Sequence, residues 1–211
     1  MRQRHRFDSL ITEIQHGLST LSHSFTKSRP SPGDHRINPE LNKQEIRKSQ
    51  GFMRVNHTGE VCAQALYRGQ AAASHNTDLK KHLEHAAIEE VDHLLWCKKR
   101  LNELGTHESY LNPLWYVSSF LLGFVTAKKS DAVSLGFVEE TEKQVMAHLK
   151  KHQATLSPQD YKSRAIIDVM KEDEERHAEN AKTLGAAPLS QLMKLIMTLQ
   201  SRVMTSTAYF I

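Results

Sequence analysis

Two short motifs contain residue types that can bind metal ions. They are Glu90-Val91-Asp92-His93 and Glu174-Glu175-Arg176-His177, and in each a glutamate precedes a histidine by three residues. Three residues are close to one turn of an α-helix, so the carboxylate and the imidazole of each pair point the same way. Two such pairs, each complemented by a lone inward glutamate from another helix, are the ligand set of di-iron and di-manganese four-helix bundles.

The spacing alone is weak evidence for a metal site. Chance predicts about one Glu-x-x-His pair in a chain with 16 glutamates and 13 histidines among 211 residues, and three are present. The third pair, Glu13 and His16, precedes a proline-rich segment, and no partner helix matches it. We therefore expect Glu13 and His16 to form a surface pair, and most of the remaining histidines to be solvated.

The helical periodicity around the two later motifs is more specific. Apolar positions recur at steps of three and four residues along two predicted helices, which is the pattern of a helix face that packs in a bundle. The motif residues fall on these stripes: Leu79, Leu83, Ala86, Glu90, His93, Cys97 and Leu101 in one helix, and Ile167, Met170, Glu174, His177, Ala181 and Leu184 in the other. Buried carboxylates without partners cost several kcal/mol each. The stripes therefore predict bound cations, and oxygen ligands with imidazole suit iron or manganese.

Two further glutamates complete the predicted ligand set. Glu142 shares an apolar stripe with Val138 and Val145, which favours it over the alternative Glu139. Glu60 lies among small residues of an earlier predicted helix and precedes Glu90 by 30 residues, while Glu142 precedes Glu174 by 32. The matched spacings indicate two similar helical hairpins. The predicted metal ligands are Glu60, Glu90, His93, Glu142, Glu174 and His177.

Three acidic residues outside the predicted ligand set could orient the two histidines. Metal-bound histidine usually donates its second ring N–H to a carboxylate. Glu89 and Asp173 lie four residues before His93 and His177, and Asp92 lies between Glu90 and His93. The sequence leaves open which acid serves which histidine, and whether any of the three is solvated.

The composition predicts one all-α domain. Hydrophobic residues make up 39% of the chain and charged residues 25%, with only six prolines and nine glycines. The net charge of +4 suits an anionic membrane surface or nucleic acid, although many soluble enzymes carry as much. The absence of a dense Lys/Arg block argues against nucleic acid as a partner. Two distant cysteines form neither a disulfide framework nor a Cys-rich zinc site, so Cys62 and Cys97 are expected to be buried free thiols.

The chain divides into residues 1–40, an N-terminal extension with a short amphipathic helix and a linker at 29–39, and a helical bundle over residues 41–211. Helices are expected at about 42–75, 78–104, 114–126, from 131, from the capping segment 157–160 to 184, and at 189–209. Glycines at 51, 59 and 69 would weaken the first of these locally or permit close packing.

Residues 111–127 and 189–211 are unusually apolar for surface helices, although no run of 18 apolar residues exists. We interpret them as interfacial membrane helices, with bundle packing or an oligomer contact as the alternative.

Several motifs together resemble the demethoxyubiquinone hydroxylase family of ubiquinone biosynthesis. They are Arg54-Val55-Asn56-His57-Thr58-Gly59-Glu60, the two Glu-x-x-His motifs and Pro113-Leu114-Trp115, while Ser134-Leu135-Gly136-Phe137-Val138 with Thr141-Glu142 resembles the bacterial branch. The resemblance covers about residues 45–211. It implies a ferritin-like four-helix bundle with two additional apolar helices, in which the six predicted ligands hold two iron ions per chain.

The resemblance also implies an activity. Family members are monooxygenases that hydroxylate the ring of 3-demethoxyubiquinol with O₂ and two electrons, giving 3-demethylubiquinol and water. No catalytic residue beyond the di-iron centre is expected. The polyprenyl tail of such a substrate implies a peripheral membrane protein on the cytoplasmic face of the bacterial cell membrane, with a biosynthetic complex or a homo-oligomer as candidate assemblies. The electron donor and the tail length are not specified by the sequence.

Two other classes of protein share parts of this pattern. A different ferritin-like oxidase, catalase or iron-handling protein would use the same ligands but needs no apolar entry surface, and the lack of a Cys-rich iron site disfavours a rubrerythrin. A non-catalytic, membrane-associated helical protein would bind no metal.

Overall fold

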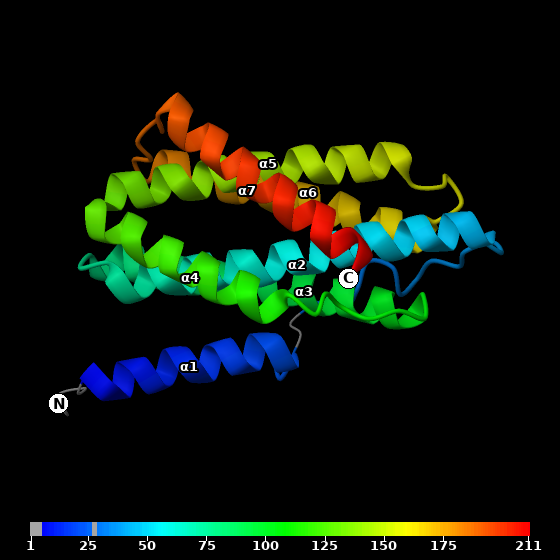
Figure 1. Cartoon of the computed structure of the whole chain (residues 1–211), viewed down its shortest axis with the longest axis horizontal. Helices are drawn as coiled ribbons and strands as arrows, with labels where there is room; N and C mark the ends of the chain where they lie inside the picture. The colour runs from blue at the N-terminus through cyan, green and yellow to red at the C-terminus, as the bar shows by residue number, and fades with distance from the viewer. Residues whose placement is uncertain (1–5, 27–28) are drawn as a thin grey trace.

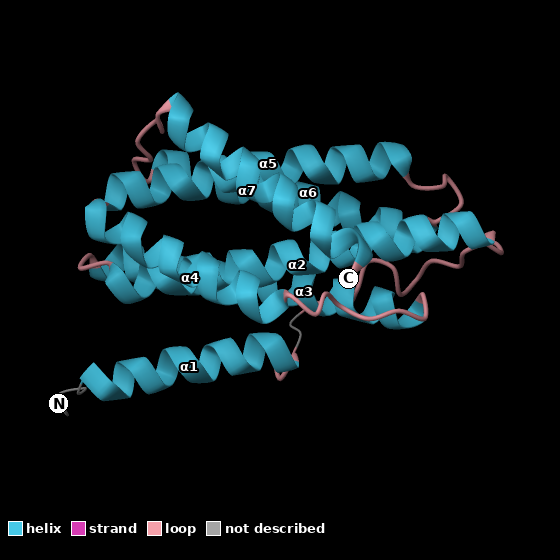
Figure 2. Cartoon of the chain, viewed as in Figure 1, coloured by secondary structure: helices cyan, strands magenta, loops and turns pink. Residues whose placement is uncertain are grey.

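The computed structural model describes residues 6–26 and 29–211, with side chains from residue 8 onward, and this part of the chain is helical without strands (Figures 1 and 2). The all-α prediction is confirmed. Residues 1–5 and 27–28 of the predicted N-terminal extension lie outside the described residues. The helices are α1 (Arg6–Ser22), α2 (Lys43–Ala73), α3 (Thr77–Glu103), α4 (Asn112–Lys129), α5 (Asp131–Thr155), α6 (Tyr161–Thr183) and α7 (Gln191–Phe210).

Two helical hairpins form the bundle. Helices α2 and α3 pack as one hairpin and α5 and α6 as the other, and the hairpins meet where α3 contacts α6 and α2 contacts α5. Helix α4 runs along α2 and links the hairpins, α7 crosses α2 and α5, and α1 packs against α2 and α4 on one side of the bundle (Figure 1). The two additional helices predicted from apolar composition are thus α4 and α7.

Side-chain caps set the helix boundaries. Asn42 and Glu45 form a capping box at the start of α2, and Asn76 accepts from two backbone N–H groups at the start of α3. The prediction that α6 opens within the capping segment 157–160 is wrong. Asp160 caps that helix by accepting from the Ser163 N–H, so α6 begins at Tyr161, after a turn.

Small residues allow α4 to approach α2 backbone to backbone. A Cβ on Gly69 would lie 2.1 Å from the Phe120 carbonyl oxygen, and a Cβ on Gly123 would lie 2.3 Å from the Leu66 carbonyl oxygen. Gly51 similarly accommodates the ring of Tyr209. The expectation of close packing is confirmed at Gly51 and Gly69. A Cβ on Gly59 would meet nothing within 4 Å.

Apolar side chains fill the bundle on both sides of its middle. One buried cluster includes Leu83 and Val138, and another includes Trp96, Leu149 and Met170. In α3, α5 and α6 the predicted ligands fall between members of these two clusters. The candidate site therefore lies in the middle of the bundle, between two apolar layers. Both cysteines are free thiols, with Cys97 buried and Cys62 half-buried.

Among the described residues, two histidines outside the predicted ligand set are buried, which shows that the expectation of solvated histidines is wrong at these positions. His57 is fully buried and His152 is 4% exposed. His152 Nδ1–H donates to Asn56 Oδ1 at 2.8 Å, and its ring stacks on Phe52 with centroids 4.4 Å apart. Burial, aided by the nearby His148 and Lys151, lowers the pKa of His152 to about 3. The adjacent lysines in the sequence suggested a solvated residue, but the helical turn directs this one inward.

The buried His152 predicts a defined pH dependence of stability. Between pH about 6.5 and about 3 the unfolded chain binds a proton at His152 that the folded chain does not bind. The free energy of unfolding is therefore highest above pH 6.5 and falls as the pH decreases, with a contribution of about 1.4 kcal/mol per pH unit from this group. Urea unfolding of the wild type and of His152→Gln, between pH 7.5 and 4.5, measures this contribution.

The glutamine variant should lose stability less steeply as the pH falls, because its amide can donate to Asn56 but does not titrate. His35→Gln, at an exposed site, controls for the loss of one histidine. Parallel pH profiles for the wild type and His152→Gln would contradict the assignment.

Candidate metal centre

The six predicted ligand residues meet inside the bundle. Each has at most 4% of its surface exposed. Their ligand atoms form two overlapping groups, and within each group all atoms lie within 4.8 Å of one another. Glu90 and Glu174 belong to both groups. The first group is Glu60, Glu90, His93 and Glu174, and the second is Glu90, Glu142, Glu174 and His177.

The two shared glutamates each face both histidines. His93 Nδ1 lies 2.9 Å from Glu90 Oε2 and 3.3 Å from Glu174 Oε1. His177 Nδ1 lies 2.8 Å from Glu90 Oε1 and 3.3 Å from Glu174 Oε2. One oxygen of each shared carboxylate is therefore directed to each half of the centre. This is the arrangement that carboxylates need to bridge two cations.

Several buried polar atoms in the centre lack hydrogen bonds. Glu90 Oε1, Glu174 Oε2 and His177 Nδ1 have no hydrogen-bond partner. Glu90 Oε1 and His177 Nδ1 lie close together, but their angles do not suit a hydrogen bond. Buried polar atoms without partners are rare and costly. A cation between these atoms would satisfy them, so the residues fit a metal centre.

Electrostatics lead to the same conclusion. Burial, together with the charges of Glu90 and Glu174, raises the pKa of Glu60 and Glu142 well above the usual range. Burial also disfavours the ionised form of Glu90, but His177 and His93 hold its pKa well below the usual value. Burial opposes protonation of His177, yet Glu90 and Glu174 raise its pKa to about 12. Without a cation the centre retains protons, and a bound metal would displace them.

The structure places Glu142 within the centre and the alternative, Glu139, outside it. Glu142 is 1% exposed, and its Oε1 accepts a hydrogen bond from the Tyr67 hydroxyl at 2.5 Å. Glu139 instead pairs with Lys143 along the outer face of α5. Tyr67 is a site residue that the sequence analysis missed. Its position on the same helix face as Glu60 and Ala63 was the available signal.

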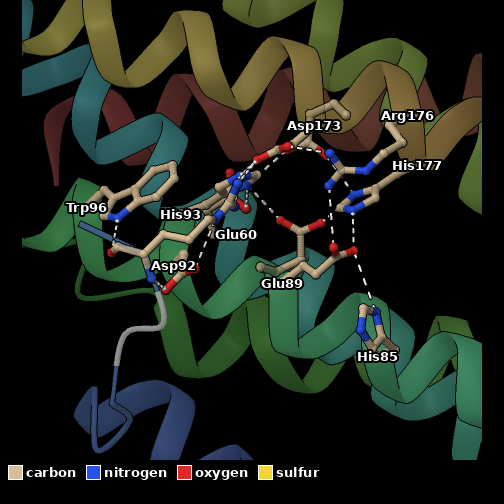
Figure 3. A network of polar contacts seen from close by, with 12 residues as sticks. Glu60, His85, Glu89, Asp92, His93, Trp96, Asp173, Arg176 and His177 are labelled. Atoms are coloured by element: carbon tan, nitrogen blue, oxygen red, sulfur yellow. Dashed lines mark hydrogen bonds and ion pairs between the residues drawn. The ribbon is translucent and has the colours of Figure 1, made fainter. Parts of the chain in front are cut away.

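Two carboxylates outside the six predicted ligands, here called the outer acids, each contact the histidine of the opposite hairpin (Figure 3). His93 of α3 contacts Asp173 of α6 through Nε2 and Oδ2 at 2.9 Å, and His177 of α6 contacts Glu89 of α3 through Nε2 and Oε2 at 3.1 Å. With a hydrogen on each Nε2, the Nδ1 lone pairs face the centre, as metal-ligating histidines require. These contacts pair Asp173 with His93 and Glu89 with His177, a choice that the sequence left open.

Asp92 has a different partner, because its carboxylate binds the Arg29 guanidinium with Oδ2 and Nε 3.0 Å apart. The Glu13–His16 motif lies on α1, apart from the centre. Glu13 forms an ion pair with Arg68 of α2 and is only partly exposed, so the expected surface pair is in fact a helix contact.

A cavity of about 130 Å³ reaches the centre at Glu60. Helices α2, α4, α5 and α7 supply its walls, which are mainly apolar, and Gly59 leaves space beside Glu60. Residues that line it include Gly59, Glu60, Leu66, Leu122, Phe137 and Met197. A small apolar ring could therefore approach one side of the centre.

Comparisons with known proteins agree with the resemblance drawn from the motifs. The family model described as "Ubiquinone biosynthesis protein COQ7" matches residues 47–208. Similar relatives are proteins named 3-demethoxyubiquinol 3-hydroxylase. One from Bordetella petrii is 48% identical, with 100% of this chain and 94% of the relative covered. One from Coxiella burnetii (strain RSA 331) is 48% identical over 97% and 95%, and one from Legionella pneumophila (strain Paris) is 46% identical over 100% of both chains.

The family match covers the bundle apart from the first turn of α2, together with α4 and nearly all of α7, and the relatives extend over the N-terminal helix as well. The motif of residues 54–60, the two Glu-x-x-His motifs and the buried centre all lie within the matched region. The chain therefore belongs to the COQ7 family of ubiquinone biosynthesis proteins.

Proposed function

We propose that this chain is a 3-demethoxyubiquinol 3-hydroxylase with two iron ions, held by Glu60, Glu90, His93 and Glu174 and by Glu90, Glu142, Glu174 and His177. The observation that carries the proposal is the pair of overlapping buried groups that share two carboxylates. The names of the full-length relatives support the substrate. The donor set suits manganese as well as iron, and the family resemblance favours iron.

The reaction balances as a monooxygenation. One oxygen atom of O₂ enters a ring C–H bond as a hydroxyl group, the other leaves as water, and a donor supplies two electrons and two protons. Iron, when bound, supplies the redox chemistry that activates O₂. The chain supplies ligands that are already gathered, outer acids that orient the histidines, and a surrounding that excludes water.

The cavity supports a substrate-oxidising enzyme over an iron store. An apolar cavity of about 150 Å³ is large enough to hold benzene, so the observed cavity of about 130 Å³ matches the size of one ring. Its contact with Glu60 would bring such a ring to the centre. The ring substituents and the polyprenyl tail would have to extend between α4 and α7, whose side chains complete the walls.

The same two helices carry exposed apolar faces. On α4, Leu114, Val117 and Val125 are more than half exposed, and on α7 the same holds for the residues Leu192, Leu195, Ile196, Leu199, Val203 and Phe210. Within the described residues, no helix is long and apolar enough to cross a bilayer. We propose that α4 and α7 lie on the cytoplasmic face of the cell membrane, so that a lipid-borne quinol enters between them. A homo-oligomer or a biosynthetic partner is the competing occupant of these faces.

The proposed ligand set predicts that variants of the neighbouring residues Glu139 and Glu142 differ in iron content. Purified wild-type protein should contain about two iron ions per chain, and Glu139→Ala should match it because Glu139 faces Lys143 outside the centre. Glu142→Ala should lose iron, and Glu174→Ala, which removes a shared carboxylate, should lose both ions. Elemental analysis with circular dichroism as the folding control measures this. Equal iron content in all variants would refute the ligand set.

If the substrate ring enters the cavity beside Glu60, filling that cavity should lower turnover. Gly59→Leu places a side chain in open space beside Glu60 without removing a ligand. Turnover of demethoxyubiquinol with O₂ and a reductant, followed by mass spectrometry of the quinone, should fall at least about tenfold. Iron content should not change, and Gly59→Ala should retain most activity. Wild-type turnover by a folded Gly59→Leu variant would rule out this cavity as the substrate site.

Membrane association predicts flotation with liposomes. Wild-type protein should float with vesicles, and the paired change Leu195→Glu and Leu199→Glu should reduce the bound fraction several-fold, because it charges the exposed face of α7. Ile88→Glu, at an exposed apolar site on α3, is the matched control. If the wild type fails to bind vesicles of any composition, the membrane proposal is wrong.

A further inference from the structure

The segment between α1 and α2 is attached to the bundle at several points. Its Ser31 and Gly33 are buried, and Asp34 forms an ion pair with Lys99 of α3. Asn38 donates to Asp160 Oδ1 and accepts from the Lys162 N–H, both at 3.0 Å. The part of this segment that the structure describes is therefore held against α3 and α6, the helices that carry the two Glu-x-x-His motifs.

Arg29 is fixed in this segment by its backbone and by its side chain. Its N–H donates to Asp92 Oδ1 at 3.3 Å, and its carbonyl oxygen accepts from Trp96 Nε1 at 3.3 Å. The guanidinium carbon lies 4.8 Å from the centroid of the Trp96 ring, a cation–π contact. These contacts leave the guanidinium little freedom to reorient.

The guanidinium joins α3 to α6 next to the centre. Arg29 Nε binds Asp92 Oδ2 at 3.0 Å, and Arg29 Nη1 binds Asp173 Oδ2 at 2.8 Å. That oxygen of Asp173 is the one that accepts from His93 Nε2 at 2.9 Å. Figure 3 shows Asp92, Trp96, Asp173 and His93 gathered at this point. Arg29 thus contacts the acid that orients one predicted metal ligand.

The other half of the centre has no comparable cover from this segment. Glu89, which serves His177, has 32% of its side chain exposed, and its arginine partner, Arg176, has 47% exposed. The side chains of Asp92 and Asp173 are only 2% and 6% exposed. Nearly buried carboxylates of this kind need a counter-charge and hydrogen bonds. Arg29 contacts both of them, and Arg176 Nη1 also binds Asp173, at Oδ1 and 2.7 Å.

We propose that Arg29 is a positioning residue for the half of the centre that contains His93. It holds Asp173 against the imidazole and so fixes the Nδ1 atom toward Glu60, Glu90 and Glu174. The segment before α2 is accordingly a part of the metal site. The inference rests on the proposed function insofar as these groups bind iron.

The test is anaerobic titration of metal-free protein with Fe(II) against a chromophoric chelator, with Mössbauer spectra of bound ⁵⁷Fe to distinguish the two ions. In Arg29→Gln one ion should bind as in the wild type, and the other should bind roughly tenfold more weakly, the lower end of the effect of losing an outer partner of a ligand, because Asp173 itself remains and keeps its contact with Arg176. Arg29→Lys keeps the charge without the two-armed contact and should show the same selective loss to a smaller extent.

Two matched variants sharpen the result. Arg36→Gln, an exposed arginine of the same segment, should bind both ions normally. Arg176→Gln removes contacts to both Asp173 and Glu89, so both ions should weaken. If Arg29→Gln is unfolded by circular dichroism, Arg29→Lys provides the decisive titration.

Unchanged affinity for both ions in a folded Arg29 variant would overturn the proposal. Equal weakening of both ions would also overturn it, since that result indicates general destabilisation. If the wild type itself binds no Fe(II), the proposed function fails, and that outcome is distinct from a failure of the Arg29 inference.

Discussion

The burial of four glutamates in the interior of a helical bundle is the constraint on which the rest of the structure depends. Carboxylates at 2% exposure or less cannot remain there as charged groups without compensation. Groups of alternating charge surround the shared glutamates, from the inside of the bundle outward. Two histidines face them, Asp173 and Glu89 face the histidines, and arginines face these acids in turn. Three inner atoms, Glu90 Oε1, Glu174 Oε2 and His177 Nδ1, still lack hydrogen bonds, which is why the centre fits cations.

The same constraint explains the outer helices. A centre closed between two apolar layers needs a route for an organic substrate, and the cavity at Glu60 ends against α4 and α7. Glycines 69 and 123 bring α4 against α2 closely enough that it forms a wall of this cavity. The faces that do not line the cavity remain apolar and exposed, which suits helices that rest on a lipid surface.

Most of the site could be predicted from the sequence because its residues follow helical periodicity. The stripes identified Glu90, His93, Glu142, Glu174 and His177, because each interrupts an otherwise apolar face. The crosswise use of Asp173 and Glu89 was not predictable, since it depends on the relative register of α3 and α6, which no local pattern encodes. Arg29 was missed for a related reason: its proline-rich surroundings resemble a linker, and its partners lie 63 and 144 residues away. Tertiary packing also determined the burial of His57 and His152.

The central claim is that two iron ions share Glu90 and Glu174. Crystals of the iron-loaded protein, measured on both sides of the iron absorption edge, test it most directly. We expect two anomalous peaks, one beside His93 and Glu60 and the other beside His177 and Glu142, with both shared glutamates between them. A single peak, or iron bound away from these six residues, would contradict it.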